Sequence, residues 1–399
     1  MATTLNQDTR RAAERALLVQ AVIGRQSKES AADSLAELER LADTAGVVVT
    51  GSITQHRERP DPAFFIGHGK LEEVQLACRT AGANLLVFDN DLSAIQVDNL
   101  SAAAGVDVMD RTELILQIFA RRARTAEAQM QVELAQLQYL SSRIQATEKQ
   151  ARFRGGIGAR GPGEKPFQLH KAPMLHRIKV LKQKLELIQK RRARTREGRP
   201  WPVVSIVGYT NAGKSTLLNA LTRAGAHVDD RLFATLDTKS RLLFMPGGRK
   251  AILTDTVGFI RHLPHGLVAS FRSTLEEISE SDMLLVVSDA GHAYASEHAS
   301  VVRETLREMG ADRIPALWVF NKVDCGEASA RMPRLAAEYP EALFVSALTG
   351  EGLDALKLRI EAGLPVSERP FVEGGNDSWR EWRVRPGAAA GCSKKPQAG

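Results

Sequence analysis

One glycine-rich segment, Gly208-Tyr-Thr-Asn-Ala-Gly-Lys-Ser215, constrains this 399-residue chain more than any other feature. It has the pattern G-x-x-x-x-G-K-S and lies between the apolar run 203–207 and the helix-forming sequence 216–221. Its glycines permit torsions and close approaches that a Cβ would block, so successive N–H groups can face one phosphate at a helix N-terminus. The segment predicts a strand–loop–helix phosphate site, in which Lys214 reaches the β- and γ-phosphates and Ser215 ligates Mg²⁺. A glycine-rich turn that matches by chance is the alternative.

Two segments downstream have the residues with which a GTPase senses the γ-phosphate. Phe233-Ala-Thr-Leu-Asp237 is expected in a loop, where Thr235 can place its hydroxyl on Mg²⁺ and its N–H on the γ-phosphate. Asp255-Thr-Val-Gly258 ends an apolar strand with the pattern D-x-x-G. There, Asp255 would hold a Mg²⁺-bound water and the Gly258 N–H would contact the γ-phosphate. Because such contacts need a triphosphate, the sequence predicts a nucleotide-dependent switch.

Two further motifs concern the base. Asn321-Lys-Val-Asp324 follows the apolar run 315–320 and has the pattern N-K-x-D. The Asp324 carboxylate can accept from guanine N1 and N2, whereas adenine would leave it unpaired. Ser346-Ala-Leu348 would offer the Ala347 N–H to guanine O6. In this order behind a P-loop, the motifs favour GTP over ATP and make a chance match of the P-loop negligible.

These motifs define the predicted site. The residues expected to bind GTP are Gly208, Tyr209, Thr210, Asn211, Ala212, Gly213, Lys214, Ser215, Phe233, Ala234, Thr235, Leu236, Asp237, Asp255, Thr256, Val257, Gly258, Asn321, Lys322, Val323, Asp324, Ser346, Ala347 and Leu348. Lys214, Thr235 and Gly258 are assigned to catalysis, and Ser215 and Thr235 are assigned to Mg²⁺.

The residue after D-x-x-G is Phe259, where many GTPases of the Ras type have a glutamine that orients the attacking water. A phenyl ring cannot do this, so intrinsic hydrolysis is expected to be slow. Residues that could supply the missing group in cis are Arg231, Arg261, His262 and His265, although each taken alone is expected to be a surface residue. A partner could supply the group instead. A further hypothesis is that Asn211 helps to bind K⁺ in place of an arginine finger.

Residues 1–109 alternate strand and helix patterns, which predicts a small α/β domain with a largely parallel sheet. Apolar residues at helical spacing predict a helix over 30–45, and further helices are expected over 71–81 and 92–104. The segment Gly67-His-Gly-Lys70 suggests an anion site, but a plain strand-to-helix turn is favoured because the loop is too short to wrap a nucleotide. Whether this domain binds a second nucleotide such as ATP stays open.

Residues 110–198 predict a basic helical hairpin. Arg111 to about Gln150 has one long helical pattern, with apolar residues at heptad spacing from Met130 to Ile144, and a second seam runs from Met174 to Ile188. The glycine-rich stretch 154–163 between them would form the tip. From Lys171 to Arg199 there are eleven Lys and Arg against two Glu, a bias that favours phosphate contact over a solvated face of mixed charge. The RNA-contact candidates are Arg152, Arg154, Arg160 and Lys165.

The remaining domain boundaries and the composition indicate little about the reaction, but they restrict the class of protein. The G domain is expected over 199–364 and a disordered tail over 365–399. A net charge of +7 favours an anionic partner. The three cysteines, Cys78, Cys325 and Cys392, form no metal or disulfide pattern, as expected in the cytosol. No apolar run approaches ~20 residues, so no membrane span is expected. Residues 16–24 are interpreted as a strand rather than a signal peptide.

Three stretches beyond the GTPase motifs resemble the HflX family of the Obg–HflX group. They are Ile66-Gly-His-Gly-Lys-Leu-Glu-Glu, the run Val108-Met-Asp-Arg-Thr-Glu-Leu-Ile-Leu-Gln-Ile-Phe-Ala-Arg-Arg-Ala with its continuation Val132-Glu-Leu-Ala-Gln-Leu, and Gly155-Gly-Ile-Gly-Ala-Arg-Gly-Pro-Gly-Glu164. The resemblance covers residues 13–364 and implies an N-terminal α/β domain, a helical hairpin and a C-terminal Ras-like P-loop GTPase domain. It also implies binding to the 50S subunit and the 70S ribosome, and splitting of stalled ribosomes, with the hairpin tip directed at ribosomal RNA.

The sequence departs from the family at two places and leaves alternatives open. Lys165 to Pro173 replaces an acidic and arginine-rich helix start, and Thr238-Lys239 replaces Pro-Thr after the Thr235 loop. A ribosome-assembly factor or a GTPase associated with RNA modification is the alternative function. A cytoplasmic monomer is expected, with partial membrane association left open.

Overall fold

The computed structural model describes residues 14–24, 27–154, 164–196, 201–222, 232–233, 239–261 and 278–365, and describes the backbone alone for 144–154, 164–171 and 192–196. Within these residues, no helix is both long enough and apolar enough to cross a membrane. The predicted tail after residue 365, the glycine-rich stretch 155–163 and residues 234–238 lie outside the description.

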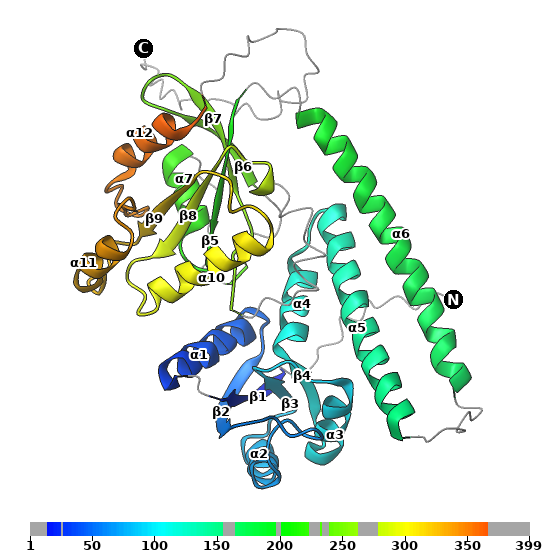
Figure 1. Cartoon of the computed structure of the whole chain (residues 1–399). Coiled ribbons are helices and arrows are strands. Elements are labelled where there is room, and N and C mark those ends of the chain that lie inside the picture. The colour runs from blue at the N-terminus through cyan, green and yellow to red at the C-terminus, as the bar shows by residue number, and fades with distance from the viewer. Residues whose placement is uncertain are drawn as a thin grey trace, which may run out of the picture.

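The N-terminal unit is a three-layer α/β sandwich (Figure 1). Its parallel strands have the order β2-β1-β3-β4. Alternate residues of β1 and β3 face opposite layers, so that Leu18 and Val87 pack towards α1 and α4 while Leu17 and Leu86 pack towards α2 and α3. The elements are β1 (Arg15–Ile23), α1 (Lys28–Thr44), β2 (Val48–Arg57), α2 (His68–Ala81), β3 (Leu85–Phe88), α3 (Ala94–Ala104), β4 (Asp107–Asp110) and α4 (Arg111–Arg122).

The turn before α2 has the structure of a strand-to-helix connection. Helix α2 begins at His68, three residues before the expected start, and Gly67 is its N-cap. The Gly67 N–H donates to the Gln55 side-chain oxygen at 2.9 Å. This bond engages an N–H that an anion site would require, and it supports the turn rather than the anion site.

The predicted single helix from Arg111 to about Gln150 is wrong: α4 ends at Arg122 and α5 (Ala126–Arg154) begins four residues later. Ala123 leaves the helical conformation with ψ of 110°, and the Thr125 hydroxyl accepts from the Ala128 N–H at 3.2 Å, which caps the new helix. No glycine or proline marks this break, so helical periodicity alone could not locate it. Tertiary packing sets it, because α4 buries Leu114, Ile118 and Phe119 on the first sheet.

Helices α5 and α6 (Glu164–Arg196) lie side by side and form the predicted antiparallel hairpin (Figure 1). Leu134, Leu181 and Leu185 are the buried part of their seam, flanked by half-buried Met130, Leu137 and Ile178. Helix α6 continues through Pro173. Most of its described side chains are exposed, so the seam with α5 is its principal packing contact.

The C-terminal unit is the predicted P-loop domain, with strand order β10-β9-β8-β5-β7-β6. Only β6 is antiparallel to its neighbour among the described strands. Helices α7 and α12 cover one face, and α10 covers the other. The elements are β5 (Val203–Gly208), α7 (Lys214–Thr222), β6 (Lys239–Phe244), β7 (Lys250–Asp255), β8 (Met283–Asp289), α10 (Ala295–Glu308), β9 (Ala316–Asn321), α11 (Ala328–Glu338), β10 (Leu343–Phe344) and α12 (Leu353–Gly363).

The two α/β units share a continuous apolar core rather than a linker of exposed chain. At their junction the Phe119 ring of α4 packs edge-on against Phe233, with 4.6 Å between the ring centroids. Figure 1 shows α1 lying between the first sheet and the C-terminal unit. The loops that follow β5, β7 and β9 meet at the carboxyl edge of the second sheet, which is where ligands bind in open parallel sheets.

Candidate functional site

The P-loop joins β5 to α7, and glycine is required at both of its defining positions. Gly208 and Gly213 have φ of +154° and +87°. A Cβ at Gly208 would collide with the Val287 carbonyl oxygen, and one at Gly213 would collide with the Asn321 amide nitrogen. Asn211 also lies in the left-handed region, with φ of +59°. The loop therefore has the tight curvature that directs backbone N–H groups towards one ligand.

Lys214 and Ser215 open α7 beside the D-x-x-G strand. The Lys214 ammonium is buried and donates to the Tyr209 carbonyl oxygen at 2.8 Å. Burial, opposed by Asp255 and reinforced by Lys322, lowers the pKa of Lys214 to about 8. The Ser215 hydroxyl donates to Asp255 Oδ2 at 2.6 Å. A hydroxyl and a carboxylate that meet in this way are oxygen donors of the kind Mg²⁺ prefers, so this pair fits a magnesium site.

The D-x-x-G segment lies directly on the P-loop. A Cβ at Gly258 would be 2.8 Å from both Lys214 Nζ and Thr210 Cγ2. The Phe259 N–H donates to the Gly208 oxygen at 3.0 Å, and the Phe259 oxygen accepts from the Thr210 N–H at 2.8 Å. The Phe259 ring is 1% exposed and packs into the apolar core shared by the two units. Its side chain therefore points away from any water at a phosphate.

The N-K-x-D loop is hydrogen-bonded to the P-loop and to the Ser346–Leu348 segment. The Asn321 amide donates to the Ala212 oxygen at 3.0 Å, and its oxygen accepts from the Ala347 N–H at 2.9 Å. Asn321 thus connects the N-K-x-D loop to the P-loop and to the Ser346–Leu348 segment. Lys322 donates to the Asn211 oxygen and pairs with Asp289, both at 2.7 Å. Asp324 is exposed, with its carboxylate available to a base.

The structure brings the P-loop, D-x-x-G, N-K-x-D and Ser346–Leu348 segments together, and several other predicted residues lie elsewhere. Phe233 instead packs on Phe119 of α4. Leu348 belongs to the Ser346–Leu348 segment, but its side chain is 80% exposed. The structure describes only the backbone of three RNA-contact candidates. These are Arg152, Arg154 and Lys165. Predicted residues outside the description are Ala234, Thr235, Leu236, Asp237, Arg160, Arg231, His262 and His265.

Of the four residues that could supply the missing catalytic group in cis, only Arg261 lies among the residues that the structure describes. The expectation that it is a surface residue is wrong. It is 8% exposed and lies at the junction with the N-terminal unit. Its guanidinium donates to the Ser30 hydroxyl and pairs with Asp33 Oδ2, both at 2.9 Å. The segment that follows D-x-x-G is thus attached to α1, which motif reasoning could not show.

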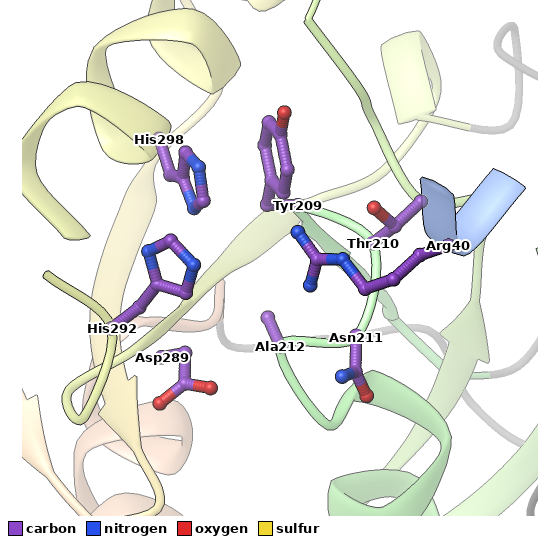
Figure 2. Close-up of a pocket in the computed structure, with 8 residues that line it drawn as sticks. All are labelled: Arg40, Tyr209, Thr210, Asn211, Ala212, Asp289, His292 and His298. Atoms are coloured by element: carbon purple, nitrogen blue, oxygen red, sulfur yellow. The ribbon is translucent and has the colours of Figure 1, made fainter. Parts of the chain in front are cut away.

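A pocket beside the P-loop contains two histidines from the C-terminal unit and Arg40 from α1 (Figure 2). The rings of Tyr209 and His298 stack with 3.8 Å between their centroids. The potential ligand atoms of Asp33, His292 and His298 lie within 4.8 Å of one another, which is the spacing of a metal site. Because Arg261 already pairs with Asp33, we assign these groups to the polar network between the two units.

Three family models match the chain in succession. The model of the GTP-binding GTPase N-terminal region matches residues 32–120, that of the GTP-binding GTPase Middle Region matches residues 122–199, and that of the 50S ribosome-binding GTPase matches residues 203–322. Together they extend over most of the chain.

Curated relatives match the chain over most of their own length. GTPase HflX from Caldanaerobacter subterraneus subsp. tengcongensis is 45% identical over 355 residues, which is 88% of this chain and 81% of the relative. GTPase HflX from Escherichia coli is 43% identical over 329 residues, 81% of this chain and 77% of the relative. Among solved structures, a GTP-binding protein from Sulfolobus solfataricus in complex with GDP is 27% identical, with a TM-score of 0.44 and coverage of 88% of this chain and 98% of that chain.

Proposed function

The chain belongs to the HflX family of GTPases, and from this premise we propose that it is a GTP-dependent factor that binds the 50S subunit and the 70S ribosome and splits stalled ribosomes. The observation that carries the proposal is the convergence of the P-loop, D-x-x-G and N-K-x-D loops. Asn321 bonds the N-K-x-D loop to the P-loop, and the Phe259 backbone bonds the D-x-x-G segment to the P-loop. The name of the matching family model, 50S ribosome-binding GTPase, supports the partner.

In this proposal the P-loop N–H groups and Lys214 bind the phosphates of GTP, and Asp324 and the Ala347 N–H select guanine. The hydrogen bonds of Asn321 to Ala212 and Ala347 support this division, because they fix the position of the P-loop relative to the two loops expected to bind the base. The exposed Asp324 supplies the acceptors that adenine would leave unpaired.

The proposed hydrolysis relies on positioned charge. Ser215 and Thr235 would hold Mg²⁺, which when bound neutralises phosphate charge. Lys214 stabilises the charge that develops on the transferred phosphoryl group, and the Gly258 N–H contacts the same group. The buried ring of Phe259 supports a slow intrinsic rate, because it places no polar group near an attacking water. A K⁺ ion near Asn211 stays a hypothesis.

The hairpin is the proposed ribosome-binding element. Helix α6 exposes basic side chains along its described length, and its end nearest the tip leads to the four RNA-contact candidates. Arg177 and Lys190 pair with Glu133 and Glu186, but the basic residues of α6 outnumber the acidic ones. Such an excess of positive charge suits phosphate groups of ribosomal RNA. GTP would order the Thr235 loop and hold the units in the arrangement that binds the ribosome.

Co-sedimentation with purified 50S and 70S particles tests the proposal. We expect more bound protein with a non-hydrolysable GTP analogue than with GDP, and loss of that binding when Arg152, Arg154 and Arg160 are changed to alanine. A variant with Arg79, Arg307 and Arg359 changed to alanine removes the same charge from exposed positions elsewhere and should bind like the wild type. Equal binding with GDP and the analogue would contradict the GTP dependence.

A further inference from the structure

Helix α1 has a polar stripe at the junction between the N-terminal and C-terminal units. Ser30, Asp33, Ser34 and Glu37 recur at helical spacing, and we call them the α1 stripe. Asp33 is 8% exposed and Glu37 is 2% exposed. Buried carboxylates are costly unless they are paired and hydrogen-bonded, so their partners reveal why they are there.

Glu37 connects the N-terminal unit to the P-loop. One of its oxygens accepts from the Tyr209 hydroxyl at 2.7 Å, and the other accepts from the Arg111 guanidinium at 2.5 Å. Arg111 also donates to Asp89 at 2.7 Å, at the end of β3. Both oxygens of Glu37 are thus engaged. The result is a continuous chain of charged and polar groups from the first sheet to the second residue of the P-loop.

Tyr209 passes the connection to the segment after D-x-x-G. Its hydroxyl donates to Glu37 and accepts from the Arg261 N–H at 2.9 Å. The Arg261 side chain returns to α1, where it contacts Ser30 and Asp33. Burial raises the pKa of Asp33, but the hydrogen bond from His298 and the charge of Arg261 outweigh it and keep that pKa below its usual value. The carboxylate is therefore ionised at neutral pH.

These bonds determine where Gly258 lies. Gly258 is three residues before Arg261 and packs against Lys214 and Thr210 of the P-loop. Phe259 is bonded to the P-loop on both its N–H and its carbonyl. Arg261, bonded to both Tyr209 and α1, anchors the far end of this short segment. The Gly258 N–H is thereby held beside Lys214. These are the two groups that would act on the γ-phosphate.

We propose that Glu37 and Asp33 are positioning residues for GTP hydrolysis: through Tyr209 and Arg261 they hold Gly258 in register with Lys214. The inference rests on the proposed GTP site. It assigns the N-terminal unit a direct part in turnover, because two side chains of α1 help to position Gly258 beside Lys214, and these are the groups that would contact the γ-phosphate. Pre-organised donors matter most in the transition state, so the effect belongs to hydrolysis and to GTP more than to GDP.

The Tyr209→Phe variant tests this, because it keeps the ring that stacks on His298 and removes the hydroxyl. We expect the single-turnover rate of GTP hydrolysis to fall roughly tenfold, with GDP affinity within about twofold of the wild type. Glu37→Gln should act similarly. When the amide oxygen of the new side chain accepts from Arg111, its NH₂ group faces the Tyr209 hydroxyl, which then loses its acceptor. The double variant should be little worse than either single one, since both break the same connection.

Tyr139→Phe is the matched control. The Tyr139 hydroxyl also donates to a buried carboxylate, Asp110, at 2.7 Å, but within the N-terminal half of the chain. It should hydrolyse GTP at the wild-type rate. Thermal melting of each variant checks folding.

A wild-type rate in Tyr209→Phe, or equal losses of GDP and GTP affinity, would overturn the positioning role and leave the proposed function in place. Strict additivity of Tyr209→Phe and Glu37→Gln would also overturn it. Failure of the wild-type protein to bind GTP would overturn the proposed function, and the positioning role with it.

Discussion

Lys214 is in an environment that favours its neutral form when no phosphate is present. It is buried beside the Tyr209 carbonyl, and its pKa is lowered to about 8. The unfolded chain would keep the proton until about pH 10.4. Between these values the unfolded state binds more protons, so this lysine makes the ligand-free protein more stable as the pH rises. Phosphates require the charged form of Lys214, so the affinity for nucleotide must decrease as the pH rises.

We therefore predict that GTP affinity falls as the pH rises from 7 to 9. The fall should approach about tenfold per pH unit once Lys214 is mostly neutral, because binding must then return a proton to it. Titration of a fluorescent GTP analogue at several pH values measures this. An affinity that stays flat between pH 7 and pH 9 would contradict it.

Phe259 shows a second effect at the residue scale, since its ring belongs to the core rather than to the phosphate site. We predict that Phe259→Gln does not restore fast hydrolysis. Its amide would be buried without partners, and the free energy of unfolding should fall by about 1–3 kcal/mol. Denaturant melts and single-turnover assays measure both quantities. Phe259→Leu keeps an apolar side chain and controls for lost volume, and a tenfold faster Phe259→Gln would disprove the prediction.

At the scale of elements, α5 and α6 depend on a narrow seam. Leu134, Leu181 and Leu185 are buried there, whereas the pair Arg177–Glu133 is exposed and stabilises the hairpin little. Periodicity identified these seam positions correctly, because two helices that meet along one line must place apolar residues every three or four positions. It did not identify the break between α4 and α5, which is set by packing on the first sheet.

We predict that Leu181→Ala loosens α6 without unfolding the G domain. Leu181 is completely buried, so the change should cost about 2 kcal/mol or more in the contact between α5 and α6. Hydrogen exchange should accelerate in residues 172–191 and stay unchanged in β5. Leu187→Ala, on the same helix at a side chain that is 59% exposed, should exchange like the wild type. Faster exchange in β5 would show that α6 is coupled to the G domain, contrary to this prediction.

At the scale of the whole molecule, the two α/β units are joined by a polar network as well as by an apolar core. Arg111 is almost completely buried, and its pKa is raised above its ordinary value because Glu37 and Asp89 outweigh the effect of burial. Such a network is sensitive to alignment, since each buried charge loses its partner if the units shift. This makes the relative position of α1 and the P-loop a single, defined arrangement.

The domain boundary predicted after residue 109 stays a prediction. We propose that α4 belongs with the N-terminal unit, since its side chains pack on the first sheet and the first family model ends at residue 120.

The loops of the candidate nucleotide site could be predicted from the sequence, because each of its motifs is a short loop whose geometry depends on local residues: glycine at 208 and 213, lysine at 214 and the Asn321 amide. The same holds for the alternation of strands and helices and for the hairpin seam. The contacts that Tyr209, Arg261 and the α1 stripe make with one another could not be predicted from the sequence. Tyr209 and Glu37 are 172 positions apart in the chain, and helical spacing shows that a polar stripe shares a face without showing what lies opposite. The partner of a buried charge is chosen by the packing of whole units, and this packing attaches the first helix to the phosphate loop.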